Sequence, residues 1–155
     1  MLFGGVEEMQ NNQPIISSNE LENFKCHLLF KKDLNRMTIL AGENSAGKSS
    51  LIQSILLFDT AVKSVNGSVF TLNVHGLNLG KSSGIVSENE GSNDTDITLT
   101  ISRKENHIKL SVDDNNDASF KIAKNVTEPD FNLFYISAER LGSRAYNNIS
   151  SASSC

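Results

Sequence analysis

The sequence predicts an α/β fold in which a glycine-containing loop joins a buried strand to a helix. Three adjoining segments support this expectation: a short apolar run over 37–41, a loop over 42–49 and an amphipathic segment over 48–64. The apolar run, MTILA, is typical of a buried parallel strand. A strand, a glycine loop and a helix in this order belong to the unit from which parallel sheets are built. With 155 residues, of which 38% are hydrophobic, the chain has the material for one ordinary domain.

The loop carries a complete sequence motif. From Gly42 to Ser49 it reads GENSAGKS, the GxxxxGK[ST] pattern of a Walker A phosphate-binding loop. The two glycines allow a tight turn that aims backbone N–H groups inward, and the following helix adds the positive end of its dipole. Lys48 supplies a point charge for the β- and γ-phosphate oxygens, and Ser49 offers a hydroxyl ligand to Mg²⁺. The predicted nucleotide-binding residues are Gly42, Glu43, Asn44, Ser45, Ala46, Gly47, Lys48, Ser49 and Ser50.

The segment after the loop has the clearest helical pattern in the chain. From Lys48 to about Ser64, apolar residues recur along one face, namely Leu51, Ile52, Ile55, Leu56, Phe58 and Val62. Gln53, Asp59 and Lys63 fall opposite, where we expect solvent. The alternative interpretation of the motif is a glycine-rich turn before an ordinary helix. We favour the phosphate loop because strand, loop and helix follow one another in the required order.

Beyond the helix, the sequence changes to short strands joined by polar loops. We expect strands over 69–74, 97–102, 108–112 and 120–123, a hairpin loop over 103–107 and a surface loop over 87–96. A small nucleoside kinase would instead continue with strand and helix pairs and a helical lid. A GTPase would carry NKxD and DxxG motifs, and the sequence contains neither.

Charge and composition limit the classes of partner. The net charge is −4 and the pI is about 5.3, which argues against a broad electrostatic surface for nucleic acid. A local basic stretch is better explained as a solvated strand edge than as a nucleic-acid contact, and it contains Lys25, His27, Lys31, Lys32 and Arg36.

Sequence features that indicate compartment point to the cytoplasm. The first residues, MLFGGVEEMQ, do not form a basic leader, and no segment has the roughly 20 apolar residues that a membrane span requires. We therefore expect no membrane partner. Cys26 and Cys155 lie far apart without a CxxC or Cys/His pattern, so both are expected to be free thiols.

Several segments resemble the ABC/SMC-like ATPases of the AAA family, including recombination-repair heads and OLD- or Septu-type antiviral ATPases. LENFKCHLLF at 21–30 is similar to their opening strand pair, and AGENSAGKSSLIQSILL at 41–57 is similar to their phosphate loop and first helix. LNLG at 77–80, with the paired strands after it, looks like their inserted β-subdomain. FYISAERLGSR at 134–144 is similar to a strand and Ser-Ala-Glu-Arg segment of the antiviral branch.

The resemblance implies a P-loop NTPase of the α/β class: the amino-terminal half of an ABC-ATPase head with an inserted antiparallel β-subdomain, itself incomplete. It divides one partial domain into a strand pair, loop and helix over 20–64, a β-rich subdomain over 65–125, and a strand with a polar tail over 130–155. It also implies ATP and Mg²⁺ as ligands, and a homodimer or larger assembly through the head. A DNA or nuclease partner in a longer protein, and a role in DNA repair or antiviral defence, are further implications.

The same resemblance suggests how a nucleotide would be surrounded. Adenine in that family rests near the opening strands, so Phe24 and Lys25 are candidates to flank the base, with core packing as the alternative for Phe24. Asn44 matches the family's loop asparagine, which shapes the γ-phosphate pocket or tolerates an unusual backbone angle.

No catalytic residue is assigned, because hydrolysis requires an Asp for Mg²⁺ and a group that orients water. The apolar run 133–136 leads to Glu139, but no Asp ends it, and an LSGGQ-like signature is absent from the sequence. Arg140 and Arg144 are candidates for phosphate or partner contacts, or for surface salt bridges. We therefore expect an amino-terminal fragment that binds ATP and hydrolyses it only when completed by a missing half. The alternative is a truncated, non-catalytic nucleotide-binding module.

Overall fold

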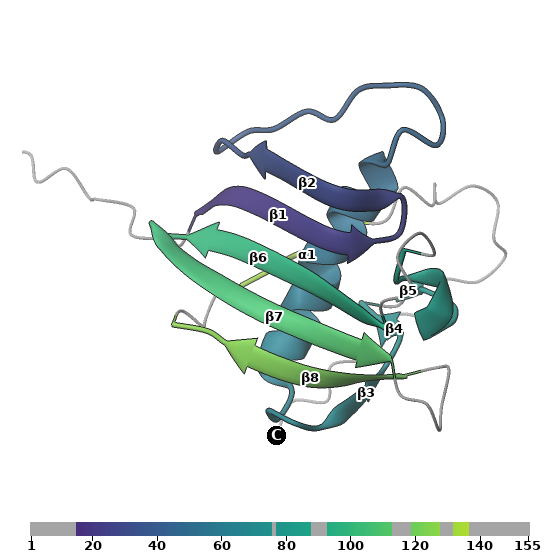
Figure 1. Cartoon of the computed structure of the whole chain (residues 1–155). Helices are drawn as coiled ribbons and strands as arrows, with labels where there is room; N and C mark the ends of the chain where they lie inside the picture. The colour runs from purple at the N-terminus through teal and green to yellow at the C-terminus, as the bar shows by residue number, and fades with distance from the viewer. Residues whose placement is uncertain (1–14, 76, 88–92, 113–118, 128–131, 137–155) are drawn as a thin grey trace, which may run out of the picture.

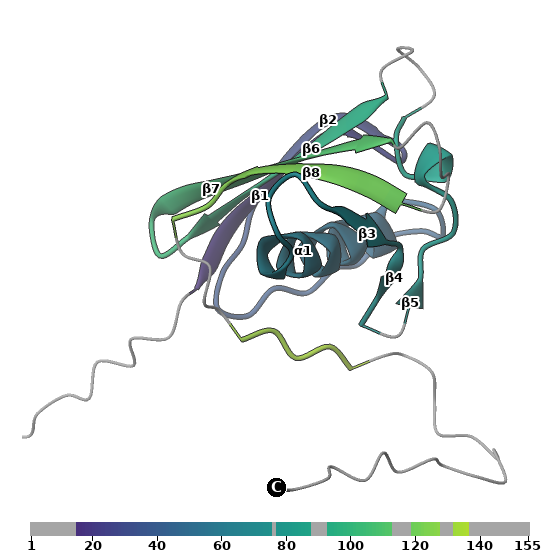
Figure 2. The same ribbon diagram turned by 90° about the horizontal axis from the view of Figure 1, so that it is seen from below.

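The computed structural model describes residues 15–75, 77–87, 93–112, 119–127 and 132–136. Its main strands are β1 (Ile16–Phe24), β2 (His27–Asp33), β3 (Val69–Thr71), β6 (Asp94–Ile101), β7 (Lys104–Val112) and β8 (Ser119–Asn125). They form one sheet in the order β2-β1-β6-β7-β8-β3 (Figure 1). The helix α1 (Lys48–Lys63) lies along one face of this sheet (Figure 2). A small ribbon, β4 (Asn73–Val74) with β5 (Leu77–Asn78), and the 3-10 turn η1 (Ser82–Gly84) complete the described elements.

This architecture contradicts the expected α/β fold of a P-loop NTPase head with an inserted β-subdomain. All the strand pairings in the six-stranded sheet are antiparallel, and the described residues contain a single α-helix. The antiparallel sheet is the main body of the described chain, and it includes the opening hairpin β1–β2 together with β6, β7 and β8. The opening strand pair and the helix were placed correctly, but the parallel sheet expected around them was wrong.

Two apolar runs account for the error. The segment 37–41 forms no strand, and the Met37 and Ile39 side chains are 78% and 77% exposed. Residues 132–136 also form no strand, and Phe134 is 89% exposed. A parallel strand is stable only when neighbouring strands bond it and helices cover it. Neither run pairs with a strand in the described chain, so both are irregular despite their composition.

The central strands of the sheet alternate between buried and partly exposed residues. Along β6, Thr95, Ile97, Leu99 and Ile101 are buried, whereas the residues between them are partly exposed. The buried face packs against α1 in a core that includes Leu56, Leu57, Phe58, Ile108, Leu110 and Phe120. Strict alternation of this kind is the pattern of an antiparallel sheet that is half covered and half solvated.

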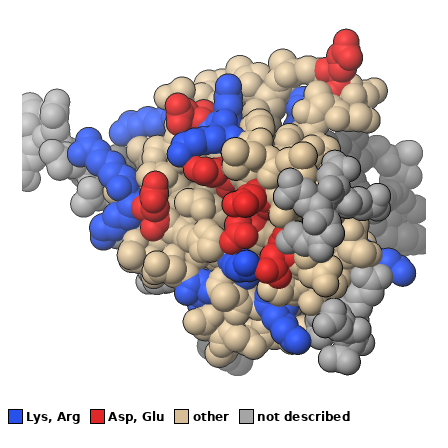
Figure 3. Space-filling view, viewed as in Figure 1, with Lys and Arg blue, Asp and Glu red and all other residues tan. Residues whose placement is uncertain are grey.

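The opposite face of the sheet is polar. Acidic and basic side chains are interleaved across it (Figure 3). Cross-strand ion pairs join Glu20 to Lys31 at 2.8 Å and Asp94 to Lys109 at 2.8 Å. The side chains of both pairs are well exposed, so this face of the sheet is solvated. Among the described residues, α1 is the single α-helix and covers the other face.

Two strand boundaries differ from expectation. The β6–β7 connection is a two-residue turn at Ser102 and Arg103, with φ values of 50° and 67°, so β7 begins at Lys104 inside the expected loop 103–107. Positive φ at both central residues is the geometry that matches the twist of a tight hairpin. Neither residue is Gly or Asn, so the usual sequence signal for this turn was missing. β6 likewise begins at Asp94, inside the expected loop 87–96, of which residues 88–92 lie outside the described ranges.

A buried carboxylate fixes the far end of α1. Asp59 is 1% exposed, although the helical pattern placed it on the solvent side. Its Oδ2 accepts hydrogen bonds from Lys63 Nζ and His75 Nε2, each at 2.8 Å. His75 belongs to the turn between β4 and β5, so this pair ties the small ribbon to the helix. The ribbon covers a helical face that the sequence pattern left open to water.

The helix is also held at its carboxyl end by the sheet. Lys124 of β8 donates from Nζ to the carbonyl oxygen of Val62 at 2.6 Å and to that of Ser64. A lysine in this place satisfies terminal carbonyls and complements the negative end of the helix dipole. Both contacts therefore fix the carboxyl-terminal turns of α1, to the ribbon through Asp59 and to β8 through Lys124.

Replacing His75 tests the ribbon contact. His75→Ala leaves the Asp59 side chain, 2% exposed, with Lys63 as its ion-pair partner, so we expect a loss of about 1–3 kcal/mol in the free energy of unfolding. His107→Ala is the matched control, because the His107–Asp96 pair has side chains 43% and 24% exposed and should contribute less than about 1 kcal/mol. Urea denaturation measures both, and equal losses would contradict the assigned role of Asp59.

Candidate phosphate-binding site

The GENSAGKS loop leads directly into the amino terminus of α1. Gly47 is the N-cap residue, with φ 79° and ψ 5°, and its carbonyl accepts the Leu51 N–H at 3.1 Å. No side chain caps this end of the helix. The first backbone N–H groups of an α-helix have no partner within the helix, and they carry the positive end of its dipole. The expected helix start is therefore confirmed.

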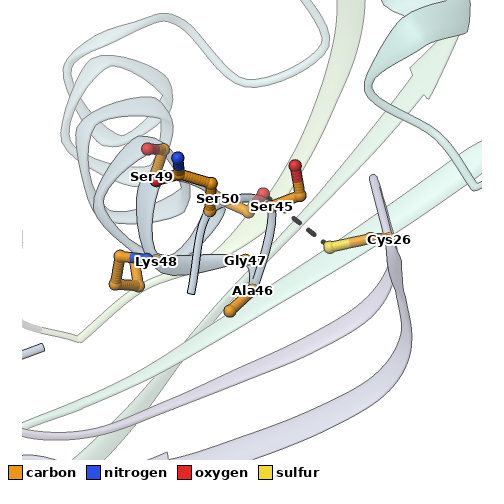
Figure 4. Close-up of a pocket in the computed structure, with 8 residues that line it drawn as sticks. Cys26, Ser45, Ala46, Gly47, Lys48, Ser49 and Ser50 are labelled. Atoms are coloured by element: carbon orange, nitrogen blue, oxygen red, sulfur yellow. Dashed lines mark hydrogen bonds between the residues drawn. The ribbon is translucent and has the colours of Figure 1, made fainter. Parts of the chain in front are cut away.

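A cavity of about 210 Å³ lies at this loop. It is lined by Cys26 and by the continuous run Asn44, Ser45, Ala46, Gly47, Lys48, Ser49 and Ser50 (Figure 4). Of the predicted binding residues, Gly42 and Glu43 are absent from this lining. Both contribute through their backbone carbonyls to the position of Lys48.

The Lys48 side chain folds back onto its own loop. Nζ donates to the carbonyl oxygen of Gly42 at 2.7 Å and to that of Glu43. These carbonyls face inward because the chain turns sharply before the helix. An anion that enters the cavity must compete with these two carbonyl oxygens for the ammonium group. A phosphate oxygen is the stronger competitor, because it carries a negative charge that attracts the ammonium group, whereas the carbonyl oxygens are neutral dipoles.

The two serines after Lys48 differ in environment. Ser49 is exposed and lines the cavity, so its hydroxyl is accessible to a cation. Ser50 is 8% exposed, and its Oγ lies 4.0 Å from Cys26 Sγ. Mg²⁺ binds few protein oxygens and keeps its waters or takes phosphate oxygens. Ser49 fits that role, whereas Ser50 packs α1 against the β1–β2 turn.

The turn between β1 and β2 approaches the loop through an unusual backbone path. Asn23 and Lys25 have φ values of 52° and 53°. The left-handed residue Asn23 interrupts the alternation of β1 and directs Phe24, 0% exposed, into the core. Asn tolerates this conformation better than most residues. Phe24 therefore occupies the core, as the alternative interpretation stated, and does not line the cavity.

Lys25 is held beside the helix and not in the cavity. Its Nζ donates to Gln53 Oε1 at 2.6 Å, and its backbone N–H donates to the Ile85 carbonyl at 2.6 Å. Burial lowers the pKa of Lys25, and the neighbouring Cys26 opposes part of this change. The contacts with α1 and Ile85 fix the tip of the hairpin against the start of the helix.

The hairpin tip also determines which residue can occupy position 47. An ideal Cβ at Gly47 would lie 2.6 Å from His27 Nε2, 2.7 Å from His27 Cε1 and 3.4 Å from Cys26 Sγ. The His27 ring is in turn packed on Phe30, with centroids 4.6 Å apart. Gly47 is thus required twice, for its left-handed φ and for this close approach. No sequence pattern marks Cys26 and His27 as site residues, because their contact with the loop depends on the backbone path through Asn23 and Lys25.

Other candidate residues lie apart from the loop or outside the described residues. Glu139, Arg140 and Arg144 belong to the second group. Lys31 and Lys32 are exposed on β2, an edge strand of the sheet, and the preference for a solvated edge over a nucleic-acid contact stays a prediction. Cys26 is a free, exposed thiol, as expected.

No protein-family model matches the chain, and no curated protein matches it. Within the described ranges, no helix has both the length and the apolar character needed to span a membrane.

Adding a methyl group at position 47 tests the close approach. Gly67→Ala is the matched control, because Gly67 has φ 77° and nothing within 4 Å of an added Cβ. We expect Gly67→Ala to lower the free energy of unfolding by roughly 1–2 kcal/mol through backbone strain alone. Gly47→Ala should lose at least about 1 kcal/mol more, since its Cβ also overlaps the His27 ring. Urea denaturation measures the free energy of unfolding of both variants. Equal decreases would rule out the steric contact at position 47.

Proposed function

We propose that this chain binds the polyphosphate group of a nucleotide, with ATP and Mg²⁺ as its ligands. One observation carries the proposal: the complete GENSAGKS motif lies at the amino terminus of a 16-residue helix and lines a cavity there. Unpaired amides at a helix start, a dipole of the right sign and a nearby ammonium group are the components from which phosphate sites are made.

The size and charge of the cavity favour phosphates over a whole nucleotide. About 210 Å³ is less than the roughly 300–1,000 Å³ of pockets that enclose complete small molecules. Lys48 is the charged side chain among the described lining residues. The phosphates would occupy the loop, with the Ser49 hydroxyl available to Mg²⁺, while the ribose and base lie outside the cavity.

We propose binding, and not hydrolysis, as the activity of this chain. The described lining contains no carboxylate that would orient an attacking water, and hydrolysis requires such a group or its equivalent. The chain would then act as a non-catalytic nucleotide-binding module. An ATPase that forms only in a longer protein is the second candidate, and it rests on the sequence resemblance to ABC/SMC-like ATPases.

The wider setting rests on that resemblance alone. We propose a cytoplasmic protein that assembles as a homodimer or larger complex, with DNA or a nuclease as a partner in a longer form. DNA repair and antiviral defence are the two settings that the resemblance supplies. The fold gives these points no support, because its antiparallel sheet differs from the head that the resemblance implied.

Calorimetric titration with ATP and with pyrophosphate, each with and without Mg²⁺, tests the proposal. We expect Lys48→Ala to weaken binding about 10- to 100-fold, because a charge-assisted contact to phosphate is lost. Ser49→Ala should reduce the gain in affinity that Mg²⁺ gives while leaving metal-free binding unchanged. Lys32→Ala, an exposed lysine of β2, is the control and should bind as the parent does.

Two results would contradict the proposed function. One is the absence of saturable binding of either ligand by the parent protein at millimolar concentration. The other is equal weakening by Lys48→Ala and Lys32→Ala, which would mean that the loop lysine acts only through net charge.

A further inference from the structure

One ring nitrogen of His27, Nε2, is buried beside the loop without a hydrogen-bond partner in the described residues. Leaving a buried polar atom unpaired costs stability, so such an atom in a native structure calls for a physical reason. Its position beside the phosphate-binding loop suggests that the reason lies in the state with ligand bound.

The contacts of the ring restrict which groups can become its partner. One contact is the aromatic ring of Phe30, which has no conventional hydrogen-bonding atom. Another is Gly47, whose missing Cβ would lie 2.6 Å from Nε2. The loop on that side carries backbone N–H and C=O groups, including amides that the helix itself leaves unpaired. Cys26 lines the cavity, but His27 does not, so His27 acts on the loop and not on the bound phosphate.

We propose that His27 is a positioning residue for the phosphate-binding loop, and that its Nε2 gains a hydrogen-bond partner in the loop when a polyphosphate binds. This inference rests on the proposed function. In the described state, Lys48 bonds to the Gly42 and Glu43 carbonyls, and the ring supports Gly47 only by contact. When Lys48 turns to a phosphate, those carbonyls are released and the loop is free to adjust against the imidazole.

The variant His27→Phe tests the role of the ring nitrogen separately from the packing of the ring on Phe30. Phenylalanine keeps an aromatic ring for packing on Phe30 and removes both nitrogens. We expect His27→Phe to bind pyrophosphate and MgATP about tenfold more weakly than the parent, as for the loss of one hydrogen bond. In the absence of ligand, removing the unpaired buried nitrogen raises the urea unfolding midpoint, whereas the larger phenyl ring beside Gly47 lowers it, so a histidine resonance is measured alongside binding. His107→Phe, on the outer face of the sheet, is the control and should bind as the parent does.

Nuclear magnetic resonance distinguishes a new hydrogen bond at His27 Nε2 from a role of the ring in packing alone. With ¹⁵N-labelled histidine, the His27 Nε2 resonance should shift on saturation with pyrophosphate, whereas those of His75 and His107 should remain in place. Both of these histidines already bond carboxylates. The positioning role is overturned if His27→Phe binds as tightly as the parent, or if the His27 resonance does not respond. A parent protein that fails to bind pyrophosphate would overturn the proposed function itself, and this role with it.

Discussion

The packing of α1 against the single apolar face of the sheet is the constraint on which the other features depend. The helix core residues Leu57 and Phe58 are fully buried. Within the same interface, Asn19 of β1 donates from Nδ2 to Ser54 Oγ at 2.7 Å, and both residues are 0% exposed. Apolar contact supplies most of the stabilisation, whereas a buried polar pair is directional and favours one register of helix on strand. The start of α1, the loop before it and the β1–β2 turn therefore have fixed relative positions.

The helix, the loop and the strand pairs could be predicted because their signals are local. Periodicity located α1 to within a residue at its end, and the motif located the loop. The fold class could not be predicted in this way. The run 37–41 has the composition of a buried strand, but strand formation depends on partners elsewhere in the chain. Asp59 shows the same limit: helical periodicity placed it opposite the apolar face, and only the ribbon containing His75 explains its burial.

The candidate site was also predicted only in part. The motif identified the residues that line the cavity from Asn44 to Ser50, because the spacing of glycine, lysine and serine reflects local backbone geometry. The motif could not identify Cys26 or His27, because these residues lie at the turn between β1 and β2, well before the loop in sequence. The available signal was weak: Asn23, a residue type that accepts left-handed backbone angles, lies just before the turn. Close contacts between distant segments require three-dimensional information.

The bonding of Lys48 to the loop carbonyls has a consequence for discrimination among anions. Because the ammonium group is never without acceptors, a ligand gains only the difference between its own contacts and those that it displaces. A lone orthophosphate offers few oxygens for this exchange. A chain of linked phosphates spans several amides at once, and each added contact costs little further translational entropy once the first is made. On the proposed function, these internal bonds of Lys48 would make the resting loop favour di- and triphosphates over free phosphate.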